Sequence, residues 1–159
     1  MNSEIQIEKI KPDNFDAFLY LVEKLAEYEK LSPPDGKAKK RLKKDAFSEN
    51  PKYEAYLAKL NEEYVAYLIF FMNYSSFLAL PVLYIEDIFV LKKYRKRGIG
   101  QLLFNFCILK AEEKNCGRME WHVLDWNKLG VDFYEKNKAI HLSNWKYYRL
   151  NRDRFKEFL

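Results

Sequence analysis

The segment from Lys92 to Gln101 combines a dense positive charge with two closely spaced glycines. Five of the six residues from Lys92 to Arg97 are basic, and Gly98 and Gly100 follow with one residue between them. Backbone N–H groups at the start of a helix attract anions, and glycine lets the backbone approach a phosphate closely. The segment is therefore either a phosphate site or a basic turn, and its neighbours decide between the two.

The elements on either side favour the phosphate site. The residues upstream read LYIEDIFV, which is typical of a strand, and those downstream read LLFNFCILKAEEK, which is typical of a helix. This helix is expected to bury Ile99, Leu102, Leu103 and Phe106, with Leu109 or Ala111 further along. A glycine turn between a strand and an amphipathic helix is the context in which a helix N-terminus holds an anion. The spacing matches neither GxGxxG nor GxxxxGK[ST], which disfavours a dinucleotide fold and a P-loop NTPase.

Hydrophobic periodicity predicts the elements that must position this loop. In chain order they are a strand at 4–10, a helix opened by Pro12 and Asp13, a basic helix at 37–48, a hairpin with strands at 53–60 and 64–74, a strand at 82–91, the helix after Gly98, a strand at 118–124, a helix at 127–138 and a strand at 145–150. This order indicates an α/β fold with a mixed sheet and helices on both faces. At 159 residues the chain is long enough to bury one core, so we expect a single domain over residues 1–159.

Several classes of protein are disfavoured by composition. Apolar runs such as that at 67–72 are too short to span a membrane, and the N-terminus lacks the pattern of a signal peptide. Two cysteines, Cys107 and Cys116, make neither a disulfide framework nor a metal quartet. His122 is expected to be a strand histidine, and His141 lies in a predicted loop. We therefore expect a cytoplasmic protein with no metal and no membrane attachment.

Positive charge is concentrated in two places. The net charge is +5, and six Lys or Arg lie between Lys37 and Lys44 as well as the five near the glycines. Sites for RNA interleave aromatic with basic residues, and 37–44 contains no aromatic residue. That segment is interpreted as the solvated face of a helix. A basic nucleic-acid-binding module remains the non-enzyme alternative.

Three segments together resemble a known family. VLKKYRKRGIGQLLF resembles the pyrophosphate-binding motif of the GNAT superfamily of N-acetyltransferases. LVEKLAEYEKL, YIEDIFV and DWNKLGVDFYEKNKA resemble its spermidine/spermine (diamine) and thialysine N-acetyltransferase branch. The resemblance covers nearly the whole chain. It implies acetyl-CoA as co-substrate, a single-domain, mostly antiparallel sheet flanked by helices on both faces, and a homodimer.

The resemblance also assigns residues to the co-substrate. The strand residues Ile88, Phe89 and Val90 would pair with the pantetheine arm, and Asn127 would contact the cofactor, although a plain helix N-cap is an equal and compatible interpretation. Tyr134 would lie near the thioester sulfur; the alternative is a core aromatic. The loop that would hold the pyrophosphate consists of Arg95, Lys96, Arg97, Gly98, Ile99, Gly100 and Gln101.

The chemistry of amide formation explains the residue types. A primary amine with a pKa near 10.4 is protonated at neutral pH and cannot attack a thioester until it loses a proton. Glu86 matches the family glutamate that accepts this proton, directly or through water, and the Tyr134 hydroxyl can donate to the departing thiolate. Glu86 and Asp87 are adjacent, so regular strand alternation would let only one of them face the site. Either one could instead be a structural carboxylate.

Substrate recognition departs from the polyamine branch. Tyr28 and Glu29 match the family pair that contacts the substrate. Polyamine enzymes carry further acidic residues just after this pair, whereas this chain has Lys30, two prolines and the basic segment 37–44. We therefore expect a small amine, either a short diamine or a lysine-like amino acid, to be preferred over a polyamine. Acetylation of a protein lysine or N-terminus is the alternative within enzymes.

Overall fold

In the computed structural model, residues 5–159 are described and fall into two compact units that divide after His122. The elements of the first unit are β1 (Ile5–Lys9), α1 (Phe15–Glu29), α2 (Gly36–Ala46), β2 (Glu54–Leu60), β3 (Glu63–Ser75), β4 (Leu80–Val90), the 3₁₀ turn η1 (Lys92–Tyr94), α3 (Ile99–Glu113) and β5 (Arg118–Glu120). The second unit contains α4 (Lys128–Lys136) and η2 (Arg152–Glu157). The predicted order is confirmed up to α4. The predicted strand start at Glu4 lies outside the described residues.

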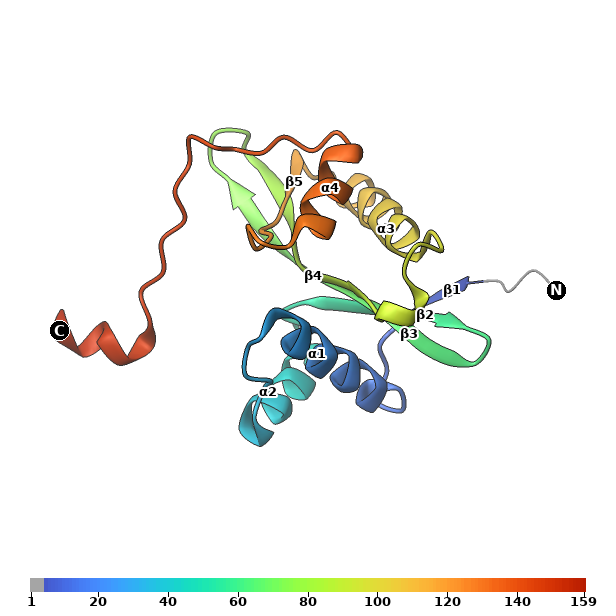
Figure 1. Cartoon of the computed structure of the whole chain (residues 1–159). Coiled ribbons are helices and arrows are strands. Elements are labelled where there is room, and N and C mark those ends of the chain that lie inside the picture. The colour runs from blue at the N-terminus through green and yellow to red at the C-terminus, as the bar shows by residue number, and fades with distance from the viewer. Residues whose placement is uncertain (1–4) are drawn as a thin grey trace. The chain divides into compact units, whose positions relative to one another are not determined.

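The five strands form one sheet in the order β1-β2-β3-β4-β5 (Figure 1). Neighbouring strands are antiparallel except for β4 and β5, which are parallel. Helices α1 and α2 cover one face of the sheet and α3 covers the other (Figure 1). The predicted mixed, mostly antiparallel sheet with helices on both faces is confirmed. The turn between β2 and β3 places Asn61 and Glu62 at positive φ, which is the backbone geometry of a tight hairpin.

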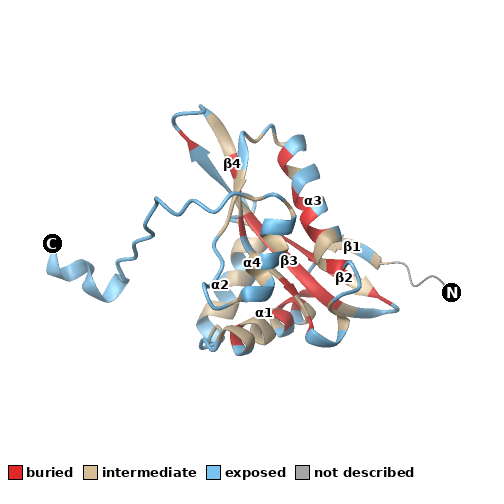
Figure 2. Cartoon of the chain, turned by 45° about the horizontal axis from the view of Figure 1, so that its top comes forward, coloured by how far each residue is buried: buried red, intermediate tan, exposed pale blue. Residues whose placement is uncertain are grey.

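Aromatic side chains fill the core between the sheet and α1. Phe18 is fully buried, and its ring meets that of Tyr67 edge to face with centroids 5.5 Å apart. Tyr67 in turn lies 6.2 Å from the ring of Phe89. Figure 2 shows buried residues concentrated in β3, whose central residues are covered on both sides. Because burial of aromatic rings contributes strongly to stability, this cluster gives the sheet a rigid centre.

The opposite face of the sheet packs against α3. The ring of Tyr56 stacks on Phe70 and meets Phe106 of α3 at 4.7 Å. The predicted burial of Leu102 is wrong, since that side chain is 37% exposed. The face of α3 that meets the sheet is rotated from the predicted stripe, and its buried residues are Ile99, Leu103, Phe104, Cys107 and Ala111.

Helix α2 presents its basic residues to solvent. The carboxylate of Asp35 caps the helix by accepting from the Ala38 N–H at 2.7 Å, and Leu42 packs toward the core. Lys39 forms an ion pair with Glu23 of α1. Lys40 and Lys44 are exposed, which agrees with the interpretation of segment 37–44 as a solvated face.

The strands predicted near the C-terminus differ from the structure. The strand predicted at 118–124 is shortened to β5, because β4 pairs with only those three residues. The strand predicted at 145–150 is wrong, since residues 123–159 contain no strand. A strand forms only where its backbone hydrogen-bonds to a neighbouring strand. The apolar pattern at 145–150 is compatible with a strand, but it does not provide the neighbour.

Candidate functional site

A β-bulge in β4 determines where the acidic residues lie. Ile69 of β3 pairs with Asp87, but the next residue, Phe70, pairs with Ile85, so Glu86 is an extra residue. A bulge breaks the strict alternation of side chains along a strand. Asp87 therefore shares a face with its partner Ile69 and with the buried aromatic cluster next to α1. With strict alternation, Asp87 would lie on the same face as Ile85, which is the face that packs against α3.

Three carboxylates gather at this bulge and influence one another. Glu29, the last residue of α1, has its pKa raised by burial and by the charge of Glu86. Burial raises the pKa of Asp87 to about 7, and the charges of Glu86 and Glu29 act in the same direction. The regular alternation on which the expectation for this adjacent pair was based does not hold at the bulge, and both carboxylates interact electrostatically with Glu29. These three residues, Glu29, Glu86 and Asp87, are called the acidic cluster below, and a nearby cation would favour their ionised forms.

Tyr67 is the hydrogen-bond donor beneath the cluster. Its hydroxyl donates to Oδ2 of Asp87 at 2.9 Å, and the side chain is fully buried. This hydrogen bond acts against burial and holds the pKa of Asp87 lower than it would otherwise be. The sequence analysis considered Asp87 only beside Glu86, and it did not single out Tyr67. The adjacent acids in YIED were the available signal for Asp87, whereas Tyr67 sits in an apolar run of β3 with nothing to distinguish it.

Arg95 connects the basic loop to the end of α1. Its guanidinium lies 4.5 Å from the ring centroid of Tyr28 and 5.6 Å from that of Phe89. Its Nε donates to the backbone carbonyl of Val90 at 2.9 Å. The structure therefore brings Arg95 and the predicted substrate residues Tyr28 and Glu29 into one region.

The loop ahead of α3 has the backbone geometry of an anion site. Lys96 and Gly98 both adopt positive φ, at 62° and 79°, and no side chain caps the start of α3. The first amide groups of a helix have no acceptor within the helix, and they carry the positive end of its dipole. Among the other basic residues, Lys93 pairs with Glu63 at 2.9 Å and Arg97 lies over the Tyr94 ring. The side chain of Ile99 is buried and anchors the loop to the core.

One edge of β4 is open next to this loop. The parallel partner β5 pairs only with 82–84, so beyond Tyr84 no strand within residues 5–159 pairs with that edge. The predicted cofactor residues lie on this stretch: Phe89 is buried, while Ile88 and Val90 are half-buried. An extended ligand can add to such an edge by backbone hydrogen bonds.

The two remaining predicted residues lie in the second unit. Asn127 caps α4, and its side chain accepts from the Gly130 N–H at 3.2 Å. The N-cap interpretation is thus confirmed, and it leaves a contact with the cofactor open. Tyr134 is half-buried on α4, and its ring lies 5.3 Å from that of Phe133.

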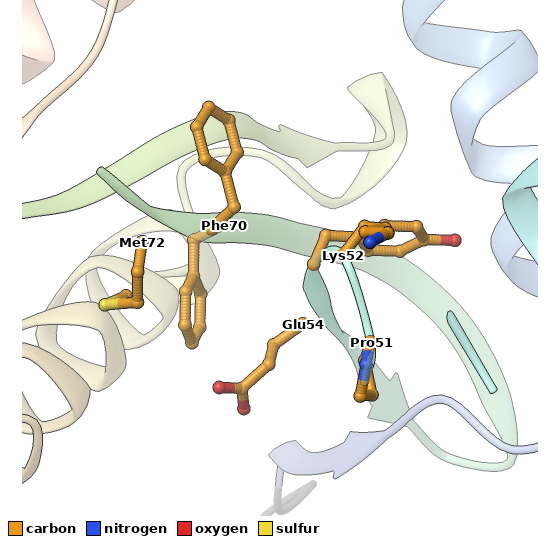
Figure 3. Close-up of a pocket in the computed structure, with 7 residues that line it drawn as sticks. Pro51, Lys52, Glu54, Phe70 and Met72 are labelled. Carbon is orange, nitrogen blue, oxygen red and sulfur yellow. The ribbon is translucent and has the colours of Figure 1, made fainter. Parts of the chain in front are cut away.

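A pocket elsewhere in the first unit contains none of the predicted site residues. It has a volume of about 270 Å³ and lies between the start of β2 and the end of β3 (Figure 3). Its one carboxylate, Glu54, already binds Lys114 at 2.7 Å and accepts from Tyr56 at 2.9 Å. These hydrogen bonds outweigh the effect of burial and lower the pKa of Glu54. The carboxylate of this pocket is therefore already paired.

Other reactive side chains have ordinary structural partners. Cys107 is buried, and burial raises the pKa of its thiol to about 12, so it is no nucleophile. His122 shares a hydrogen bond with the Tyr84 hydroxyl. Within residues 5–159 no group of three or more potential ligand residues is arranged to hold a metal ion. In the same stretch no helix has the length and apolar character that crossing a bilayer requires.

Comparison with known proteins identifies the fold. A model of the Acetyltransferase (GNAT) family matches residues 20–138, a stretch that includes the acidic cluster and the loop ahead of α3. The chain belongs to the GNAT acetyltransferase family. It is an acetyl-CoA-dependent N-acetyltransferase, as the sequence resemblance implied.

Two relatives in sequence are named for the acetylation of small amines. The L-ornithine N5-acetyltransferase NATA1 of Arabidopsis thaliana is 43% identical over 107 residues, which are 66% of this chain and 47% of that protein. This acetyltransferase thus spans about half the length of that relative. The thialysine N-epsilon-acetyltransferase of Bos taurus is 30% identical over 164 residues, which cover 96% of both proteins.

Solved structures confirm the GNAT architecture. The aminoglycoside N-acetyltransferase AAC(6')-Iy in complex with CoA superimposes with a TM-score of 0.78, at 16% identity, over 95% of this chain and 97% of that one. A probable acetyltransferase gives a TM-score of 0.79 at 21% identity, over 92% of this chain and 97% of that one. At identities this low, the similarity to these structures shows only that the fold is shared.

The mutual influence of the three carboxylates can be measured directly. A carboxyl-carbon NMR titration of the free enzyme should show Asp87 with a pKa of about 7. Replacing Glu86 by Gln removes a like charge and should lower that pKa, whereas Glu113→Gln, on the exposed side of α3, should leave it unchanged. An ordinary aspartate pKa near 4 in the unaltered enzyme would contradict the acidic cluster.

Proposed function

We propose that this enzyme transfers the acetyl group of acetyl-CoA to a primary amine of a small molecule, either a short diamine or a lysine-like amino acid. The observation that carries the proposal is the acidic cluster of Glu29, Glu86 and Asp87 next to the open edge of β4. A cluster of like charges without a cation is costly, and a substrate ammonium supplies the missing charge. The names of the relatives, which act on ornithine and thialysine, support an amine of this size.

The co-substrate would lie along the open edge and the start of α3. Its pantetheine arm would pair with the backbone of Ile88, Phe89 and Val90. Its pyrophosphate would bind the loop from Arg95 to Gln101, where positive charge and the helix dipole converge. The hydrogen bond from Arg95 to Val90 ties these two parts of the co-substrate site together.

Acetyl transfer would proceed by direct attack in a ternary complex. Glu86 is exposed at the bulge and would accept the proton of the bound ammonium, directly or through water. The free amine nitrogen would then form a bond to the thioester carbonyl carbon, and the carbon–sulfur bond would break. The departing CoA thiolate would take a proton from the Tyr134 hydroxyl, and the second proton that the nitrogen loses as the amide forms would return to the Tyr134 oxygen, directly or through water. No covalent intermediate on the enzyme is needed.

Asp87 would act as a fixed counter-charge for the substrate. With a pKa of about 7 it is only partly ionised at neutral pH in the absence of substrate, and a bound ammonium would favour its ionised form. Its proximity to Glu29 gives the ammonium two carboxylates besides the proton acceptor Glu86. Spermine carries more ammonium groups than the cluster has carboxylates.

Several features expected from the family resemblance stay predictions. These are the homodimer, the cytoplasmic location and a single acetyltransferase domain over residues 1–159. Family membership favours the enzyme over a nucleic-acid-binding module. Protein N-acetylation remains the other outcome of a substrate screen.

The substrate proposal is tested by comparing amines at one ionic strength. We expect kcat/KM for thialysine and a short diamine to exceed that for spermine by roughly 10–150-fold, because each unmatched ammonium forfeits a charge-assisted hydrogen bond of about 1.5–3 kcal/mol. Thiol release in the presence of acetyl-CoA gives the rates, and lysine peptides and whole proteins belong in the same screen. A clear preference for spermine or for protein would overturn the proposal.

The co-substrate site is tested at Gly100, in the first turn of α3. Gly100→Val places a branched side chain where the backbone would approach the pyrophosphate and should weaken CoA binding at least ten-fold, by analogy with other close phosphate contacts. Gly36→Ala is the matched control, since a Cβ there meets no atom within 4 Å. Equal CoA affinity of Gly100→Val and the unaltered enzyme by calorimetry would exclude this loop.

Tyr134 is tested by removing its hydroxyl alone. If the hydroxyl assists departure of the thiolate, Tyr134→Phe should lower kcat by roughly 10²–10⁴ while the affinity for CoA barely changes, because the ring is retained. Phe133→Leu, next to it on α4, serves as a control for packing. Full turnover by Tyr134→Phe would reduce this residue to a packing role.

A further inference from the structure

The hydrogen bond between Tyr67 and Asp87 lies at the centre of the amine site, yet the reaction described above gives Tyr67 no part. Tyr67 is in the middle of β3, where it pairs with Phe89 of β4. Its hydroxyl reaches past this partner to Oδ2 of Asp87, at 2.9 Å. The contact joins the central strand of the sheet to the acidic cluster.

The ring of Tyr67 has little freedom to move. It is fully buried and lies between the ring of Phe18 from α1, at 5.5 Å, and that of Phe89, at 6.2 Å. Closely packed interiors hold side chains in single rotamers. The direction of the hydroxyl is therefore set by the aromatic core and not by the ligand.

Tyr67 can only be a donor in this contact. Burial, followed by the charge of Asp87, raises the pKa of the Tyr67 hydroxyl well above its usual value of 10. The hydroxyl thus stays protonated across the working range of pH. A hydrogen bond donated to a carboxylate favours its ionised form.

The other groups that face Asp87 act in the opposite direction. Glu86 on β4 and Glu29 on α1 both raise its pKa, as burial does, and Tyr67 on β3 alone lowers it. No Lys, Arg or His within residues 5–159 forms an ion pair with Asp87. Oδ1 of Asp87 accepts no hydrogen bond in the same part of the chain.

We propose that Tyr67 is a positioning residue of the amine site, which holds Asp87 by Oδ2 so that Oδ1 receives the substrate ammonium. This inference rests on the proposed function and adds a residue to it. Tyr67 touches neither substrate nor co-substrate and acts through Asp87. This role explains why a hydroxyl is present at a core position where the ring of phenylalanine would pack equally well.

The consequence is a specific dependence on pH. Without the hydroxyl, Asp87 would ionise only at higher pH, so near neutral pH more of the enzyme would present a neutral acid to the ammonium. Amine binding would weaken most below the pKa of Asp87 and least well above it. Binding of acetyl-CoA, which does not involve the cluster, would not change.

The experiment compares Tyr67→Phe with the unaltered enzyme between about pH 5.5 and 9. The acid limb of kcat/KM for the best amine should move up by about one pH unit, and the amine KM at pH 7 should rise roughly ten-fold. The KM for acetyl-CoA should stay the same. Tyr64→Phe is the matched control, because Tyr64 is on the same strand and donates to Glu8, away from the cluster. It should leave the pH profile unchanged.

Carboxyl-carbon NMR gives a readout that needs no substrate. The pKa of Asp87 should rise in Tyr67→Phe and stay unchanged in Tyr64→Phe. In an Asp87→Asn background, Tyr67→Phe should have no further effect on the amine KM, as expected when one residue acts through another. Thermal unfolding of each variant separates these effects from loss of folding.

The outcomes distinguish the two proposals. If the unaltered enzyme acetylates small amines but Tyr67→Phe retains its pH profile, amine KM and Asp87 pKa, the role of Tyr67 is overturned and the proposed function stands. If no small amine is acetylated, the proposed function fails. The positioning role in an amine site then fails with it, even where the NMR titration still shows that Tyr67 sets the pKa of Asp87.

Discussion

The acidic cluster depends on one extra residue in β4. Without the bulge at Glu86, the register with β3 would turn Asp87 toward α3, and its carboxylate would leave the face that α1 covers. With the bulge, Glu86 and Asp87 both interact with Glu29 at the end of α1. Carboxylates that lie close together in a partly buried site disfavour one another's ionised form, and a cationic ligand would relieve that cost. The proposed recognition of an amine thus depends on the register of two strands.

The aromatic core provides the rigidity that such a cluster requires. Phe18, Tyr67 and Phe89 link α1, β3 and β4. The hydrogen bond from the Tyr67 hydroxyl restrains the side chain of Asp87 as well. Arg95 makes a second link, since it contacts Tyr28 of α1 and the carbonyl of Val90. The residues proposed for the amine and those proposed for the pyrophosphate are therefore held by the same packed elements. A site built on a helix end and two strands is more precise than one built on loops alone.

The sequence predicted those parts of the fold that depend on local pattern. The glycine loop, the hairpin and the amphipathic helix α1 each carry a signal within a few residues, and Tyr28, Glu29 and Glu86 were proposed as site residues from a resemblance in short motifs. The bulge was not predicted, because periodicity gives the faces of a strand only when its register is regular. Tyr67 was missed because a buried tyrosine that donates to a carboxylate and one that merely packs look the same in an apolar run. The segment 145–150 has a strand-like pattern, but strand formation depends on a partner that the pattern does not contain.

The account is tested most directly by the crystal structure of the enzyme with CoA and thialysine bound together. It predicts that an ammonium group of thialysine lies within about 4 Å of carboxylate oxygens of Asp87 and Glu29, the distance of an ion pair. It also predicts that the Tyr67 hydroxyl still donates to Asp87 in the complex. A thialysine molecule whose ammonium groups all lie away from Glu29, Glu86 and Asp87 would contradict the claim that the bulge in β4 creates the amine site.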